Sequence, residues 1–373
     1  MLLEQVISAS GSLLVDVNQA LRDQRQPLEA RAVALRAATD YLEHVKERVG
    51  DDPRIVTAVI RSYTQLGHVI GSGGDTSLGK YADAANLFGR AAEIGRDLLS
   101  TYDSMDLRVC LADATEELAL LASDEARVSL FGEAAGHVTA AAAMTQESEL
   151  QGRLLRRGIQ YRLRAATISS DVDGLRGCVE ELRALTFQRP KDAALWGEFG
   201  LAARNLGEVL VETDRAGALK MLNSCIDGFG ASINLGVDDF SNNRHIAQAR
   251  VLSARCRAGR ETAESLLSSI ELGISQSQRA SGLQHWDNFA RLSHMQTLLS
   301  AAARGVEIAT APPPAGQQLT RPEIAARVAE LVRRELAQVE SVASSTPAHP
   351  LEPQVRQRIN EDLARLDAMA RPG

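Results

Sequence analysis

The sequence has few aromatic residues, little lysine and no long apolar run. Aromatic residues make up 4% of its 373 positions, which argues against all-β folds because strands favour aromatic and β-branched side chains. No apolar stretch reaches the roughly 18 residues that a membrane-spanning helix needs. Hydrophobic residues nevertheless make up 45% of the chain. The sequence therefore predicts a folded protein with a sizeable core and no membrane span.

The chain also lacks an excess of positive charge. It has 41 basic and 48 acidic residues, a net charge of −7, and a pI near 5.6. Only four of the basic residues are lysine, and the arginines adjoin one another only at Arg156-Arg157 and Arg333-Arg334. Nucleic-acid-binding domains usually carry a basic patch or a high pI, so we predict no nucleic-acid partner.

Cysteine and targeting signals are equally sparse. The four cysteines are Cys110, Cys178, Cys225 and Cys256. Their spacing fits no zinc template, and each lies among apolar residues at helical spacing, so buried thiols are expected. The first residues show neither the basic region nor the long apolar core of a signal peptide. The sequence predicts a cytoplasmic protein or a piece of a larger one.

Composition and apolar periodicity predict helices along nearly the whole sequence. Alanine, leucine and arginine dominate it, and all three favour helices, as does the common glutamate. Apolar residues recur at spacings of three and four. The segments that this periodicity predicts to be helical are 28–49, 55–70, 81–99, 107–121, 126–144, 150–168, 175–185, 193–211, 216–229, 246–256, 262–274, 289–306, 322–342 and 353–369.

Two stretches interrupt the helical pattern. Residues 71–79 form a glycine-rich loop, and residues 311–316 read Ala-Pro-Pro-Pro-Ala-Gly, which is typical of a stiff extended linker. These breaks predict a helical-repeat body over residues 1–308, a proline-rich linker over 309–320 and a flexible helical tail over 321–373.

An internal repeat sets the expected architecture. Tyr63-x-x-Leu66-Gly67-x-x-Ile70 matches the first helix of a tetratricopeptide repeat. Small residues allow two helices to approach closely, and each pair must stack on its neighbours to bury its remaining apolar face. The second-helix positions that complete the repeat are Ala84, Phe88 and Ala91. A second unit contains Ala203, Leu206, Gly207, Leu210, Ala218, Leu222 and Cys225; looser units lie near Leu118–Leu130 and Ala263–Ile270. We predict an all-α, right-handed superhelix of antiparallel helix pairs.

The first unit resembles a more specific family. Its run Asp51-Asp52-Pro53, the segment from Tyr63 to Val69, the glycine loop and the following Ala84, Phe88, Ala91 and Leu98 are similar to the tetratricopeptide region C-terminal to the catalytic domain of bacterial eukaryotic-type Ser/Thr protein kinases. His68, Ser77 and Lys80 replace an Asp, an Asn and an Asp of that pattern. The resemblance is good over residues 28–100 and fair over 188–228. It implies a role in protein contact and sensing.

The motifs of phosphotransfer are missing. No strand-borne glycine loop, catalytic-loop Asp and Asn, or Asp-Phe-Gly occurs. Gly74-x-x-x-x-Gly79-Lys80 matches most of a P-loop, but Tyr81 follows it and a helix precedes it instead of a strand. An interhelical turn is the better interpretation.

Other chemistry-bearing residues also have plainer interpretations. The pairs Glu116-Glu117 and Glu180-Glu181 indicate solvated helix faces, and Trp196 is expected in the core. His285 and Asp287 flank Trp286, but neighbours in sequence point to different sides of a helix. Residues 238–243 lack the pattern of a calcium loop and suggest a capped interhelical loop. We predict no catalytic residue, no cofactor and no metal.

The remaining candidate surface is the groove expected on the first helices of the pairs. The residues predicted to face it, and to bind a partner, are Arg61, Thr64, His68, Arg204 and Glu208. An extended peptide or a partner helix suits such a groove, although these residues are equally typical of ordinary solvated faces. The sequence therefore favours a non-catalytic protein-interaction scaffold or sensory and docking domain of a bacterial signalling protein. The alternatives are the regulatory part of a Ser/Thr kinase whose catalytic domain is missing from this chain, and a helical enzyme or small-molecule-sensing domain that uses the glycine loop.

Overall fold

The structure is a computed structural model, and it describes residues 28–50, 52–71, 77–284, 287–312, 314, 317–342 and 348–371. These residues form fourteen α-helices and no strand. The prediction of an all-α repeat fold is confirmed. The chain divides into two compact units, Met1–Gly174 and Leu175–Gly373, and each is described by itself.

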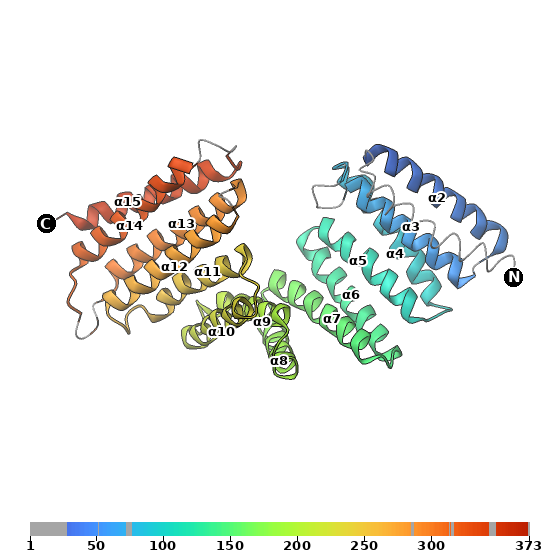
Figure 1. The fold of residues 1–373 in the computed structure, drawn as a ribbon, viewed down its shortest axis with the longest axis horizontal. Coiled ribbons are helices and arrows are strands. Elements are labelled where there is room, and N and C mark those ends of the chain that lie inside the picture. Colours follow the sequence, from blue (N-terminus) through green and yellow to red (C-terminus); the bar gives the residue numbers. More distant parts are fainter. Residues whose placement is uncertain are drawn as a thin grey trace. The chain divides into compact units, whose positions relative to one another are not determined.

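The first unit contains six helices, each packed against the next one along the chain (Figure 1). Short connections between them make consecutive helices antiparallel neighbours. The helices α3 and α5 also lie against each other, as the first helices of adjacent pairs do in a repeat. The helices are α2 (Leu28–Val49), α3 (Pro53–Gly71), α4 (Tyr81–Leu99), α5 (Met105–Leu121), α6 (Asp124–Met144) and α7 (Ser148–Ser169).

The second unit repeats this arrangement. Here α9 packs on α10 and α11 on α12, while α13 contacts both α11 and α14. The helices are α8 (Val172–Gln188), which begins just before the unit does, α9 (Ala193–Leu210), α10 (Arg215–Asn234), α11 (Phe240–Arg257), α12 (Ala263–Leu283), α13 (Asn288–Thr310), α14 (Arg321–Val342) and α15 (Glu352–Ala370).

The predicted repeat residues form the helix contacts. Phe88 is fully buried, and its ring lies so close to Gly67 that a β-carbon there would be 2.6 Å from Cε1 of the ring. In the second unit, a β-carbon at Gly207 would lie 3.0 Å from Cγ of the buried Leu222. Glycine at these positions therefore determines how closely the two helices of each pair approach.

Side-chain caps begin several helices where the sequence changes from turn to periodic pattern. Asp192, Asp214 and Asp239 each accept hydrogen bonds from backbone N–H groups in the first turn of α9, α10 and α11. These groups have no partner within the helix, so the caps stabilise the helix starts. Asp239 thus confirms a cap near residues 238–243, but Asn242 and Asn243 lie buried inside the first turn of α11.

Several predicted features fall outside the described residues. They are Ser72–Thr76 of the glycine loop, which include Gly74 of the partial P-loop, and His285 and Trp286. The flanks of the loop are described: the N–H groups of Leu78 and Lys80 donate to the carbonyls of Val69 and Ile70. The end of this loop is therefore tied back onto the last turn of α3.

The two C-terminal helices belong to the core of the second unit. Both α14 and α15 pack on α13. Ile324 and Val328 of α14 and Ile359 of α15 are fully buried in the same apolar cluster as Leu298 of α13. The boundaries 1–308, 309–320 and 321–373 stay a prediction, and α14 and α15 are packed helices within the second unit.

The cysteines and Trp196 differ in how their burial compares with the predictions. All four cysteines are free and buried, which confirms the prediction of buried thiols. Trp196 is only partly buried and donates its indole N–H to the Pro190 carbonyl, so the prediction of a core tryptophan was wrong. Among the described residues, no helix has the length and apolar character needed to cross a bilayer.

Candidate functional site: the polar face of α3, α5 and α7

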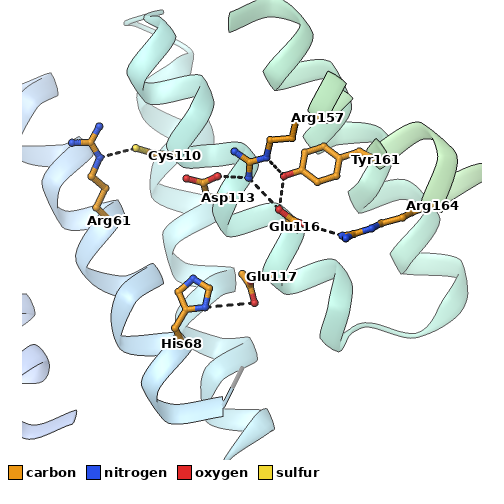
Figure 2. A network of polar contacts seen from close by, with 9 residues as sticks. All are labelled: Arg61, His68, Cys110, Asp113, Glu116, Glu117, Arg157, Tyr161 and Arg164. Carbon is orange, nitrogen blue, oxygen red and sulfur yellow. Dashed lines mark hydrogen bonds and ion pairs between the residues drawn. The ribbon is translucent and has the colours of Figure 1, made fainter. Parts of the chain in front are cut away.

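Charged and polar side chains gather where three helices of the first unit present matching faces. Figure 2 shows nine of them reaching toward one another. Most of the members on one helix lie three, four or seven residues apart, which brings them onto one face. This polar face consists of Arg61 and His68 on α3; Cys110, Asp113, Glu116 and Glu117 on α5; and Arg157, Tyr161 and Arg164 on α7.

Glu116 is the centre of the contacts between α5 and α7. It accepts hydrogen bonds from the Tyr161 hydroxyl, from Arg157 Nη2 at 3.1 Å and from Arg164 Nη1 at 2.8 Å. Arg157 also donates to Asp113 and to the Tyr161 oxygen. Two helices are thus joined by charge-assisted hydrogen bonds, the stronger class of such bonds.

These contacts shift the acidity of the groups in opposite directions. Burial alone would raise the pKa of Glu116, but the bonds from Tyr161 and Arg157 outweigh it and lower that pKa. Burial raises the pKa of Asp113 despite Arg157, and burial and the Glu116 carboxylate raise that of Tyr161. Glu116 is therefore an ionised anchor that holds the two arginines of α7 in place.

Glu117, the next residue on α5, is in the opposite situation. Its side chain is 20% exposed, and the His68 ring lies beside it, with Nδ1 3.7 Å from Oε2. Burial, followed by repulsion from Glu116 and Asp113, raises the pKa of Glu117 to about 7. The arginines of α7 are used by its neighbours, so this carboxyl group lacks a strong compensating charge within the polar face.

The other end of the face is held by Arg61. Its Nε donates to Cys110 Sγ at 3.0 Å, and its Nη2 lies 3.2 Å from Asp106 Oδ2. Burial raises the pKa of the Cys110 thiol, which keeps it in the protonated, unreactive form. Cys110 is thus a structural hydrogen-bond acceptor and not a candidate nucleophile.

Two of the predicted binding residues lie on the polar face, and a third is buried. Arg61 and His68 lie on the polar face. Thr64 does not: it is 5% exposed, and its hydroxyl donates to the Ile60 carbonyl within α3. The prediction that Thr64 faces outward was wrong because it lies one turn after the fully buried Ile60, on the core side of the helix.

The other two predicted residues lie in the second unit. Arg204 of α9 contacts Glu208 one turn later, with Nε 2.9 Å from Oε1. Its Nη1 also approaches Nδ1 of His245 on α11, at 2.7 Å. Within the second unit, the pair Arg204 and Glu208 thus belongs to a contact between α9 and α11. A role for these residues in partner binding stays a prediction.

Sequence reasoning missed the most connected acidic residues. Glu116 and Glu117 were predicted to be solvated, yet both are four-fifths buried. Positions 106, 110, 113 and 117 share one helical stripe, as do 157, 161 and 164. These stripes are visible in the sequence. Only the folded structure shows that the acidic side chains of α5 contact the arginines of α7. Glu180 and Glu181 are exposed, as predicted.

The chemistry of the face is that of a charged contact surface. The Cys110 thiol is buried, and the charged groups are engaged with one another. No group of three or more His, Cys, Asp or Glu side chains able to hold a metal occurs in the described part of the chain. What the face offers is a set of fixed charges with one undercompensated carboxyl group.

Comparisons with known proteins place the chain in no family. No family model matches it, and no curated protein matches it. Similar solved structures include the human IFIT1 dimer with PPP-AAAA, at 14% identity and a TM-score of 0.28, covering 99% of this chain and 86% of that one. The human IFIT1 dimer with m7Gppp-AAAA is 15% identical at a TM-score of 0.34, covering 96% and 76%. A likeness of this size assigns neither a family nor a ligand.

Proposed function

We propose that the chain is a non-catalytic binding scaffold whose polar face on α3, α5 and α7 receives a segment of a partner protein. The observation that carries the proposal is the environment of Glu117: a mostly buried carboxyl group beside Glu116 and Asp113, where burial and these two acids outweigh the attraction of Arg164 and Arg157. A lysine or arginine side chain of a partner would supply the missing charge. The segment we expect is therefore one that presents a basic residue.

A pair of short peptide libraries tests this function. One has lysine fixed at the centre, the other glutamate, and both have random flanks. We expect the protein to prefer the lysine library, and Glu117→Gln to weaken its binding about tenfold, because a hydrogen bond to a charged group contributes about 1.5–3 kcal/mol. Affinity for the lysine library should also rise with pH around 7, where Glu117 loses its proton.

Glu125→Gln is the matched control, since Glu125 is an exposed glutamate of α6 in the same unit. It should leave binding to both libraries unchanged. If the protein binds the two libraries equally, or if Glu117→Gln and Glu125→Gln weaken peptide binding by the same factor, the polar face is not the binding surface.

The cellular setting is a further part of the proposal. The resemblance of residues 28–100 to the tetratricopeptide region of bacterial Ser/Thr kinases favours a cytoplasmic docking or sensory role in bacterial signalling. The second candidate is the regulatory part of such a kinase. Reading the DNA upstream of Met1 distinguishes the two, because a kinase domain in frame supports only the second.

A further inference from the structure

Arg244 of α11 lacks the carboxylate partner that several other arginines of the second unit have. Arg257 and Arg304 each contact a carboxylate, whereas Arg244 contacts none in the described part of the chain. Its guanidinium carbon lies 5.8 Å from the ring centre of Phe240 and 5.8 Å from that of Phe289. Its buried Nε has no hydrogen-bond acceptor. The group thus packs beside a pair of contacting aromatic rings, and its charge is uncompensated.

The groups around Arg244 do not compensate its charge. Its nearest polar contact is His245 Nε2, at 3.4 Å from Nη2. Burial, and then Arg204 and Arg244, lower the pKa of His245 to about 3, so that ring is neutral and supplies no counter-charge. Burial and Arg204 also lower the pKa of Arg244. The region between α9 and α11 therefore favours an added negative charge.

Nearby carboxylates are already occupied. Glu208 contacts Arg204, and Asp238 contacts Asn243 and Arg279. Asp239 and Asp287 accept backbone hydrogen bonds at the starts of α11 and α13. Each of these acids already has a hydrogen-bond or ion-pair partner, and none forms an ion pair with Arg244.

The guanidinium also has a buried donor without a hydrogen-bond partner, its Nε. Buried polar groups normally have such partners. An anionic acceptor placed beside the guanidinium would therefore compensate the charge that this site lacks.

We propose that Arg244, packed beside the rings of Phe240 and Phe289, binds the carboxylate of an aspartate or glutamate side chain in a partner peptide. The planar guanidinium fork matches a carboxylate, and Phe289, 48% exposed, offers an apolar contact for the peptide beside it. One uncompensated guanidinium suits a single negative charge such as that of a carboxylate.

The test uses the glutamate-centred and lysine-centred peptide libraries with the full chain. Arg244→Met should weaken binding of the glutamate library about tenfold and leave binding of the lysine library unchanged. Arg260→Met, at an exposed arginine of the same unit, is the matched control and should change neither. Because the lysine library reports on the polar face of the first unit, failure of one site is distinguishable from failure of the other.

A stability measurement separates binding from a structural role. Removing a desolvated charge that has no partner should leave the melting temperature of Arg244→Met unchanged or raise it. A lower melting temperature with unchanged peptide binding would overturn the proposal. A single-stranded oligoadenylate is the third probe, and loss of its binding in Arg244→Met with unchanged binding of the glutamate library would show a nucleic-acid site instead.

Discussion

Glycine and phenylalanine make a very close contact between two helices of the first unit. Gly67 of α3 lies against the ring of Phe88 on α4, and the ring is fully enclosed. A side chain added at Gly67 therefore meets an aromatic ring that has no free space to move into. Gly89, one residue after Phe88, has no atom within 4 Å of the position a β-carbon would take. These two glycines of the same helix pair have opposite roles.

We predict opposite effects on stability for alanine at these two positions. Gly67→Ala should lower the free energy of unfolding by about 1–2 kcal/mol, because overpacking outweighs the better helix propensity of alanine. Gly89→Ala should raise it by about 0.5–1 kcal/mol, because only the propensity changes. Urea unfolding measures both. Changes of the same sign would show that the Phe88 ring does not constrain Gly67.

At the scale of helices, one buried ion pair joins α13 to α15. Arg291 is 0% exposed and Glu352 5%. Nη2 and Nε of Arg291 lie 3.1 and 3.3 Å from Oε1 of Glu352, which also accepts the backbone N–H of His349. The contact connects the start of α13 with the start of α15 across 61 residues of chain.

We predict that Glu352→Gln destabilises the second unit by about 3 kcal/mol, because removing one partner of a buried ion pair is strongly destabilising. The double variant Arg291→Met, Glu352→Met should regain most of that loss, since both desolvated charges are then absent. Thermal unfolding of the two variants measures this. If the double variant is less stable than Glu352→Gln alone, the ion pair has a net stabilising role that this prediction denies.

At the scale of the whole molecule, the two units carry titratable groups with opposite responses to acid. In the second unit, burial lowers the pKa of His294 to about 4 and that of His245 to about 3. Their stabilising contribution is complete above pH 6.5 and is lost as the pH falls, because the unfolded chain then binds the protons. In the first unit, Glu117 has a pKa near 7, so the folded form binds its proton first and gains stability as the pH falls.

We therefore predict that lowering the pH from 7 to 5 weakens the second unit and strengthens the first. Hydrogen exchange followed by mass spectrometry resolves both units in one experiment. Glu117→Gln should remove the gain in the first unit, because the neutral side chain no longer titrates. Parallel changes of exchange in both units over this range would contradict the assignment of the three groups.

Much of the fold could be predicted from residue spacing. The periodicity gave the bounds of 81–99 as α4 has them, and the Gly67 and Phe88 contact followed from the repeat pattern. The helix α11 begins six residues before the predicted segment 246–256, because Asn242, Asn243 and His245 are polar residues that the core buries. Hydrophobic periodicity cannot reveal a helix turn whose buried side chains are polar.

The sequence by itself determined the helical class of this protein, its paired helices and the residues at their closest contacts, because these depend on spacing along one or two neighbouring segments. Only the tertiary structure decided which charges compensate one another. Arg157 meets Glu116 from 41 residues away, Arg291 meets Glu352, and Arg244 meets no carboxylate in the described part of the chain. Electrostatic partnership depends on distances between helices, and those are set when the repeats pack together.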